Sequence, residues 1–276
     1  MKIKKRAFLP LVAVLLLFQS TCAGTAVRKE QAALPVTLPA TLPAEGRHWS
    51  YTGDTGSGYW HSLDPAWAIA KDGRAQSPVN IPAAALAPSD TMERPEFYYH
   101  ATRFEIENNG HTIELTPLEA DNYIIIDNGK YTLQQMHFHL PGEHTVDGKR
   151  FAMEAHLVHK NPEGAIVVIG ILISGGKENP VLKETFSKLP EEITLRENSA
   201  EPAELLDLAD LLPLEKGLYR YEGSLTTPPC TEGVKWAVFA RPVELSDSQI
   251  KAFAAVYSGN NRPVQPLYER KVYLTD

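Results

Sequence analysis

Cysteine is scarce in this chain of 276 residues, which contains only Cys22 and Cys230. Cys22 falls in an N-terminal segment with the features of a removable leader, so Cys230 is expected to have no partner in the mature chain. Exported domains without a sufficient core usually depend on several disulfides. A disulfide framework is therefore excluded here, and the hydrophobic core has to stabilise the fold.

A long hydrophobic run is also missing. The chain begins Met-Lys-Ile-Lys-Lys-Arg, and the apolar run that follows, residues 8–18, is shorter than the roughly 20 residues that span a bilayer. A basic start, a short apolar stretch and small residues after it predict a secretory signal peptide over residues 1–23. The protein is thus expected to be exported, either to the periplasm or into the medium. A lipid anchor on Cys22 is the weaker alternative, because Gln19 stands where a lipoprotein signal normally carries an aliphatic residue.

Positive charge is sparse beyond the first residues. Lys and Arg total 27 against 34 Asp and Glu, which gives a formal net charge of −7. Binding to nucleic acid needs a basic surface, so no nucleic-acid partner is expected. The apolar content of 43% and charged content of 22% are ordinary for a folded globular protein.

Proline marks one domain boundary. Residues 24–46 carry Leu-Pro pairs at 34–35, 38–39 and 42–43, a spacing typical of an extended linker. No second change of composition follows, so residues 47–276 are predicted to form a single domain.

The body of that domain is mainly β in pattern. Residues 123–126 and 131–140 flank Asp127-Asn128-Gly129-Lys130, a strong hairpin signal, and residues 151–159 and 165–173 are further β-rich runs. One helix is expected after Asn179-Pro180, and another from Ser246, where Gln249 completes a capping box, to about Gly259. Many strands with a few short peripheral helices predict a large central sheet.

Two of these strands carry histidines at spacings that suit a metal. Side chains alternate along a strand, so His137 and His139 share one face of residues 131–140, with Gln135 beside them. The same rule places His156 and Glu154 on one face of residues 151–159. If the two strands pair in antiparallel fashion, the three histidines converge, and three neutral imidazoles leave one position of a tetrahedral zinc open, as in catalytic sites. Gln135 and Glu154 would each accept the other ring N–H of the histidine two residues later. The alternative is a set of strand histidines without metal.

Together with these motifs, short segments spread along the chain in a specific order make it resemble the α-class carbonic anhydrases from about His48 to Tyr273. The segments are His48–Tyr51, Gln76–Ile81, Asn108–His111, Gln135–His139, Glu143–Asp147, Glu154–His159, Ser224–Pro229 and Asn260–Leu267. The resemblance implies a mostly antiparallel, twisted central sheet with zinc bound by His137, His139 and His156. It also implies reversible hydration of carbon dioxide to bicarbonate and a proton, by attack of zinc-bound hydroxide.

The other roles that the resemblance implies follow the same motifs. Thr226 accepts a hydrogen bond from the hydroxide and passes its own proton to Glu143, while the backbone near Asn260 holds His139. The apolar wall for carbon dioxide comprises Val158, Val168, Leu225 and Trp236. Thr227 lines the same cavity. His111 is the implied proton shuttle, and Tyr51 and Asn109 help to order the connecting waters. Sulfonamides and anions are the expected inhibitors, and the sequence leaves open whether the chain forms a homodimer.

Two departures from the family pattern stand out. Secreted members commonly pair the cysteine that matches Cys230 with one six residues before Gln76, but that position is Ala70 here. The usual disulfide is therefore absent. Glu114 stands where an amide is expected, and an acid there would raise the pKa of His111 or perturb its water chain.

Two rival functions are separable from this one. His137-x-His139-x-x-x-Glu143 fits part of a cupin-type iron or manganese oxygenase signature, but Gly148 lies too early for its glycine and the element before the last ligand is missing. A carbonic-anhydrase-like binding domain that has lost its metal would typically lack a zinc histidine, whereas this chain keeps all three. Metal analysis with a hydration assay separates the three readings.

Overall fold

The computed structural model describes residues 48–87, 92–194, 204–215 and 217–275. The predicted signal peptide (1–23), the predicted linker (24–46) and Cys22 lie outside these residues. Among the residues described, none of the helices combines the length and the apolar character that crossing a membrane requires.

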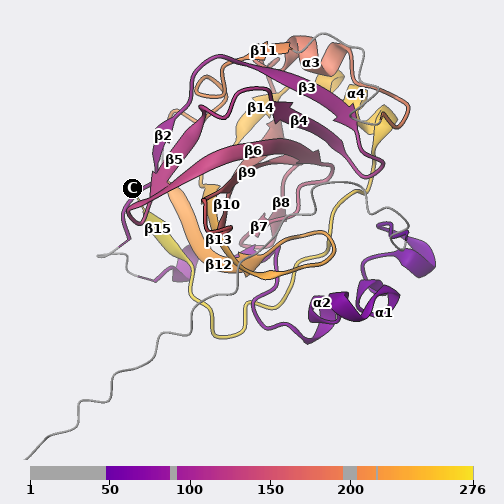
Figure 1. Ribbon diagram of the computed structural model, residues 1–276, viewed down its shortest axis with the longest axis vertical. Helices are drawn as coiled ribbons and strands as arrows, with labels where there is room; N and C mark the ends of the chain where they lie inside the picture. Colours follow the sequence, from indigo (N-terminus) through magenta and orange to yellow (C-terminus); the bar gives the residue numbers. More distant parts are fainter. Residues whose placement is uncertain (1–47, 88–91, 195–203, 216, 276) are drawn as a thin grey trace, which may run out of the picture. The chain divides into compact units, whose positions relative to one another are not determined.

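A large twisted sheet organises the domain (Figure 1), as the sequence predicted. Its main path runs in the order β11-β3-β4-β6-β9-β10-β13-β12-β15, with β14 added beside β10, and with β5 beside β6 and β2 beside β5. Most pairs are antiparallel, whereas β10 pairs in parallel with β13 and β14. The strands are β2 (Glu96–Tyr98), β3 (Thr102–Asn108), β4 (Ile113–Pro117), β5 (Tyr123–Ile126), β6 (Gly129–His139), β9 (Met153–Lys160), β10 (Ile166–Gly175), β11 (Glu204–Leu206), β12 (Leu218–Ser224), β13 (Glu232–Phe239), β14 (Val243–Leu245) and β15 (Tyr273–Thr275).

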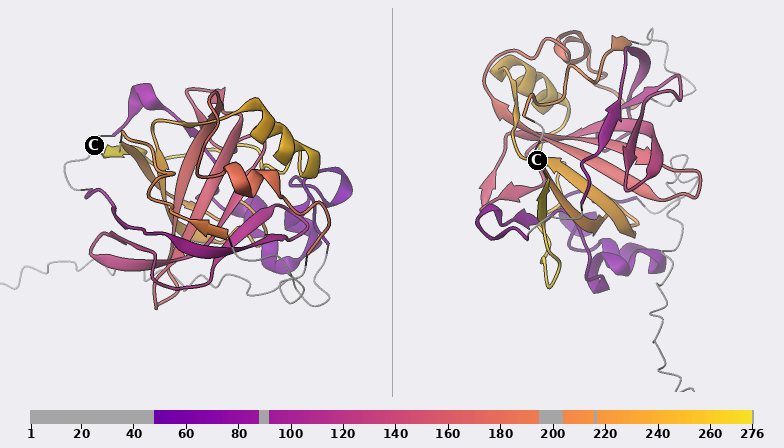
Figure 2. Two further views of the ribbon diagram at one scale, coloured as in Figure 1. Left: turned by 90° about the horizontal axis from the view of Figure 1, so that it is seen from above. Right: turned by 90° about the vertical axis from the view of Figure 1, so that its left-hand side faces the viewer.

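Short elements surround this sheet. A small sheet joins β1 (Asn80–Ile81), β7 (Thr145–Val146) and β8 (Lys149–Arg150). Figure 1 and the right-hand view of Figure 2 show that the first two α-helices lie at the opposite end of the domain from the last two. The helices are α1 (Trp60–Leu63), α2 (Ile69–Asp72), α3 (Lys183–Ser187) and α4 (Asp247–Val256), and the 3-10 turns are η1 (Gly53–Thr55), η2 (Pro65–Trp67) and η3 (Ala83–Ala85).

The local predictions for turns and caps are largely confirmed. The hairpin of β5 and β6 turns at Asp127 and Asn128, both with positive φ, as a two-residue hairpin loop requires. Ser246 and Gln249 form the predicted capping box of α4, although that helix ends at Val256, before Gly259. Asn179 accepts two backbone N–H groups, but the helix itself starts only at Lys183.

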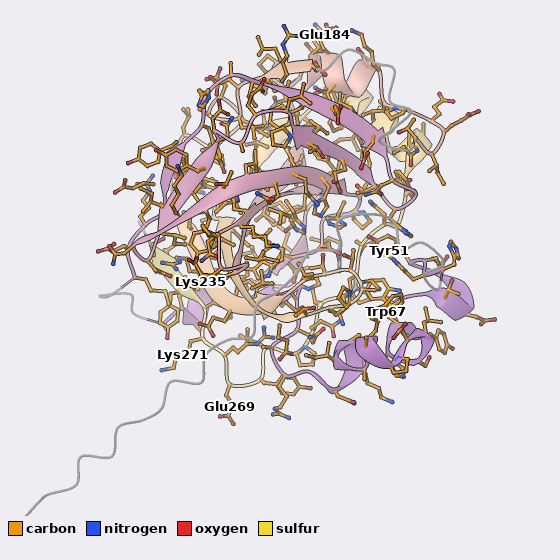
Figure 3. All side chains as sticks on the ribbon, viewed as in Figure 1. Tyr51, Trp67, Glu184, Lys235, Glu269 and Lys271 are labelled. Atoms are coloured by element: carbon orange, nitrogen blue, oxygen red, sulfur yellow. The ribbon has the colours of Figure 1, made fainter. Side chains whose placement is uncertain are left out.

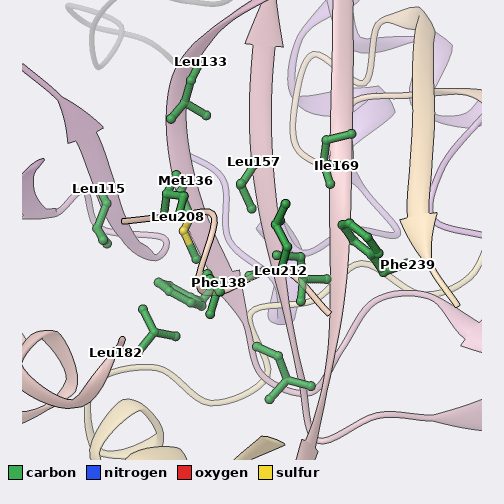
Figure 4. Packing of buried hydrophobic residues seen from close by; sticks show 14 of the residues in the cluster. Leu115, Leu133, Met136, Phe138, Leu157, Ile169, Leu182, Leu208, Leu212 and Phe239 are labelled. Atoms are coloured by element: carbon green, nitrogen blue, oxygen red, sulfur yellow. The ribbon is translucent and has the colours of Figure 1, made fainter. Parts of the chain in front are cut away.

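Apolar side chains pack on both faces of the sheet. The larger cluster, shown in part in Figure 4, includes Met136 and Phe138 of β6 and Leu157 of β9, and it extends to Phe186 of α3 and Phe253 of α4. Met136 and Phe138 alternate with the histidines of β6, so burial of one face fixes the register of the other. The second cluster lies on the histidine face and includes Val158, Val168 and Trp236.

Candidate metal centre

Strand pairing brings the three histidines together. In the antiparallel ladder of β6 and β9, His137 lies directly opposite His156, and His139 lies opposite Glu154. Directly paired residues of neighbouring strands point to the same face. One ring nitrogen from each of His137, His139 and His156 therefore lies within 4.8 Å of the others.

The other ring nitrogen of each histidine meets a hydrogen-bond acceptor. His137 Nδ1 is 2.7 Å from Gln135 Oε1, and His156 Nε2 is 2.9 Å from Glu154 Oε1. His139 Nδ1 is 2.7 Å from the backbone oxygen of Asn260. Because these oxygens accept, each ring nitrogen beside them carries the proton, and the inward nitrogen keeps a free lone pair.

Two of these lone pairs face each other. His139 Nε2 lies 3.1 Å from His156 Nδ1. A direct hydrogen bond between them would need an extra proton, since both rings already donate outward. A shared cation resolves the conflict, so the donor set fits a metal ion.

Burial keeps the rings neutral. His139 and His156 are almost fully enclosed, and burial lowers the pKa of His139 to about 4 and the pKa of His137 well below its ordinary value. Burial likewise lowers the pKa of His156, with a further contribution from His139. Three neutral imidazoles with converging lone pairs match the ligand set of catalytic zinc, which leaves one tetrahedral position open.

Glu154 joins two parts of the site. One carboxylate oxygen, Oε2, accepts from the backbone N–H groups of Glu143 and His144, both at 2.8 Å. The other, Oε1, accepts from His156 Nε2 and from His144 Nδ1 at 2.6 Å. Burial raises the pKa of Glu154, but its contacts with His144 and His156 outweigh burial and hold that pKa well below the ordinary value.

His144 also contacts the site, although no sequence pattern singled it out. Its Nδ1 donates to Glu154, and its Nε2 accepts from the Tyr221 hydroxyl at 2.6 Å. The Tyr221 oxygen lies 2.9 Å from the Ser77 hydroxyl. Both ring nitrogens of His144 are occupied, so it supports the centre from outside and does not form a second metal site. Its place after Glu143 carries no local signal for this role.

Glu143 points one oxygen at the histidines. Its Oε1 accepts from the Arg262 backbone N–H at 2.7 Å, and its Oε2 lies 3.6 Å from His139 Nε2 and 3.9 Å from His156 Nδ1. Within the described part of the chain no hydrogen-bond partner reaches Oε2, although the Thr226 hydroxyl is near enough to lower the pKa of the carboxyl. Burial is the larger effect and raises that pKa to about 7.

The predicted apolar residues form one continuous wall. Val168 of β10 is paired with Val158 of β9 and with Trp236 of β13, and Leu225 joins the same cluster. The Trp236 ring centroid lies 4.8 Å from that of His156. Thr227 follows in the loop, where its carbonyl oxygen accepts from the Cys230 N–H at 2.9 Å.

His111 lies in the turn between β3 and β4. Its ring stacks on Trp49 with centroids 3.7 Å apart, and Tyr51 meets Trp49 edge-on. Figure 3 shows Tyr51 on the side of the domain that carries α1 and α2. Burial, together with His48, lowers the pKa of His111 to about 4. The net direction is opposite to the rise expected from an acid at position 114, because burial of the ring dominates.

The segments around Ala70 and Cys230 are joined by polar contacts. Cys230 is buried and has a free thiol, whose pKa burial raises to about 11. Arg262 donates to the Ala70 carbonyl at 2.8 Å and to the Gln76 side chain at 2.8 Å. Gln76 in turn donates to the Cys230 carbonyl at 3.0 Å. These bonds connect α2 to the loop after β12 without a disulfide.

Comparison with known proteins agrees with this geometry. A family model described as eukaryotic-type carbonic anhydrase matches residues 55–276. A carbonic anhydrase from Klebsiella pneumoniae is 41% identical over 258 residues, covering 91% of this chain and 98% of that protein. One from Pectobacterium carotovorum is 39% identical, covering 81% and 89%. The solved α-carbonic anhydrase of Thermovibrio ammonificans, in complex with the inhibitor sulfanilamide, superposes with a TM-score of 0.77 at 41% identity, covering 83% of this chain and 99% of that chain.

Proposed function

The chain belongs to the eukaryotic-type carbonic anhydrases, and from this premise we propose that it hydrates carbon dioxide reversibly at a zinc ion held by His137, His139 and His156. The observation that carries the proposal is the set of three inward lone pairs, each fixed by an acceptor on the outer side of its ring. Bound zinc would supply a Lewis acid that lowers the pKa of a water ligand toward neutrality.

Glu143 and Thr226 orient the nucleophile in this proposal. Glu143 Oε2 has an open acceptor site facing the histidines, and the Thr226 hydroxyl is the nearby donor. When Thr226 donates to Glu143, its own oxygen can only accept from the attacking hydroxyl group. That bond fixes which lone pair of the nucleophile faces the substrate.

The wall of Val158, Val168, Leu225 and Trp236 suits the substrate. Carbon dioxide is apolar, so it gains from a surface that water does not solvate well and needs no charged clamp. The wall continues from His156 along the same face of the sheet, so the substrate would rest beside the open metal position.

Proton export is assigned to His111. An imidazole suits this task because its ordinary pKa lies near neutrality. Stacked on Trp49, the ring has a pKa of about 4, which is too low to carry a proton at neutral pH. We therefore infer that transfer involves a rotamer in which the ring leaves Trp49 and is hydrated. Tyr51 and Asn109 would help to order the waters along which the proton leaves, as the family resemblance implies.

The remaining expectations stay proposals. Sulfonamides should bind to this chain, and the sulfanilamide complex of the Thermovibrio protein supports that part of the proposal. We propose that they bind as anions at the zinc, with their rings on the apolar wall. Export to the periplasm or the medium is proposed from residues 1–23 alone.

Metal content and hydration rate test the proposal together. Purified protein should contain about one zinc per chain and catalyse hydration in a stopped-flow assay. His156→Ala should lose both, because two imidazoles hold zinc poorly. His100→Ala is the matched control, since that histidine is half exposed and pairs with Asp121. Unchanged zinc content in His156→Ala would contradict the ligand assignment, and iron or manganese in place of zinc would favour the oxygenase alternative.

A further inference from the structure

One carboxylate of the site has no role in the scheme above. Glu114 of β4 is paired with His137 of β6, so the two side chains share the face that carries the metal centre. Its Oε2 accepts from Gln135 Nε2 at 3.2 Å and from Asn109 Nδ2 at 3.3 Å. A single oxygen therefore meets two amides, and both present nitrogen to it.

Each of those amides acts on a functional histidine. Gln135 turns its oxygen to His137 Nδ1 at 2.7 Å. Asn109 turns its oxygen to the backbone N–H groups of His111 and Thr112, both at 3.0 Å, and so shapes the turn that carries His111. The nitrogen of each amide thus donates to Glu114, and the oxygen of each amide accepts from a histidine or from the turn that carries one.

The direction of the Gln135 amide decides the tautomer of His137. An amide has nearly the same shape after a flip that exchanges its oxygen and nitrogen. A flipped Gln135 would donate to Nδ1 and move the ring proton to Nε2, the nitrogen that faces the other ligands. A carboxylate oxygen that accepts at the far end disfavours the flip, because two donors or two acceptors would otherwise face each other.

We propose that Glu114 is a positioning residue, which fixes the amides of Gln135 and Asn109 and thereby couples the ligand geometry of His137 to the turn of His111. The proposal rests on the proposed zinc site. It requires an acceptor oxygen at position 114, and it does not require the negative charge itself. An amide-bearing Gln side chain can supply that oxygen, whereas Leu cannot.

Three variants separate contact from charge. Glu114→Leu should release zinc to a chelator about 3- to 10-fold faster than wild type, less than the roughly 10- to 100-fold typical when a direct partner of a ligand is lost. Glu114→Gln should restore most of the wild-type rate, because it keeps the acceptor. In a Gln135→Ala background, Glu114→Leu should change zinc release by less than about 2-fold, because the relay is already cut. Equal effects of Leu and Gln would overturn the proposal in favour of a long-range charge effect.

A spectroscopic readout makes the test independent of zinc. In the metal-free protein, the Nδ1 proton resonance of His137 should be present in wild type and in Glu114→Gln and should weaken or shift in Glu114→Leu. The backbone amide resonances of His111 and Thr112 should move in the same variant. An unchanged imidazole spectrum in Glu114→Leu would refute the positioning role of Glu114 even if the wild type binds zinc. A wild type without zinc would refute the proposed function instead, and this spectrum would still test the positioning role of Glu114.

Discussion

Glu154→Gln is the substitution whose outcome the structure defines most sharply. The carboxylate is fully buried and accepts four N–H groups, two on each oxygen. A glutamine replaces one of the two oxygens with an NH2 group. Two of the four N–H donors then face the NH2 group, which is itself a donor. Which two they are determines whether the protein loses stability or zinc affinity.

The two orientations differ in cost. If the NH2 group faces the backbone N–H groups of Glu143 and His144, neither can change its protonation, and two unsatisfied buried donors cost about 2 to 6 kcal/mol in total. If it faces His144 and His156, both rings can shift to the other tautomer. His156 would then donate from Nδ1 to His139 Nε2, which is 3.1 Å away. The second orientation is therefore preferred in the metal-free protein.

This preference predicts a loss of zinc affinity at nearly constant stability. Zinc binding needs the Nδ1 lone pair of His156, so the ring proton must return to Nε2, where it faces the glutamine NH2 group. This clash of two donors costs about 2 kcal/mol or more, which corresponds to a zinc affinity roughly 30-fold weaker. The free energy of unfolding of the metal-free protein should change by less than about 1 kcal/mol. Chelator competition measures the first quantity and chemical denaturation the second, with Glu163→Gln on an exposed turn as control. A large loss of stability with unchanged zinc affinity would refute the tautomer argument.

Three further predictions concern other parts of the domain. His111→Ala should slow hydration in dilute buffer and recover with added imidazole at unchanged zinc content, and a wild-type rate in dilute buffer would exclude this shuttle. Burial lowers the pKa of His159 to about 3 from an ordinary 6.5. The contribution of neutral, buried His159 to the free energy of unfolding is therefore complete above pH 6.5. It is lost as the pH falls toward 3, because the unfolded state then binds a proton that the folded state does not. Denaturation of the metal-free protein at pH 7, 5 and 4 should show a smaller loss in His159→Gln than in wild type, and equal losses would contradict this. Ala70→Cys should form a disulfide with Cys230 and raise the melting temperature in the oxidised state; closing so long a loop contributes at most about 4 to 5 kcal/mol. A bond confirmed by mass without any rise in melting temperature would show that the polar contacts already hold these segments.

Local patterns predicted the core of the site because strand geometry is local. Alternation along residues 131–140 and 151–159 was enough to place His137, His139 and His156 on one face, and the turn at Asp127 predicted the hairpin that leads into β6. Burial of Met136 and Phe138 on the other face then fixed the register.

Contacts between distant segments were not predictable in the same way. The stack of Trp49 on His111 depends on where the N-terminal segment lies, and no periodic pattern encodes it. Burial of the ring, together with His48, lowers the His111 pKa, which is the opposite of the direction expected from Glu114. The parallel pairs of β10 with β13 and β14 likewise connect segments about 70 residues apart, beyond the reach of hairpin signals.

The division between local and distant contacts also explains why His139 needs Asn260. In a strand, the nearest neighbour on the same face is two residues away, so Gln135 serves His137 and Glu154 serves His156. The corresponding neighbour of His139 is His137, whose free lone pair is directed at the metal centre and whose other nitrogen donates to Gln135. An acceptor must therefore come from another part of the chain, and the backbone oxygen of Asn260 fills this place. The Asn260 side chain secures that segment by accepting from the Leu140 N–H and donating to the carbonyls of Phe138 and His111. A His-x-His pair on one strand thus requires a third segment to complete its outer shell, and in this protein the same residue also anchors the turn that carries His111.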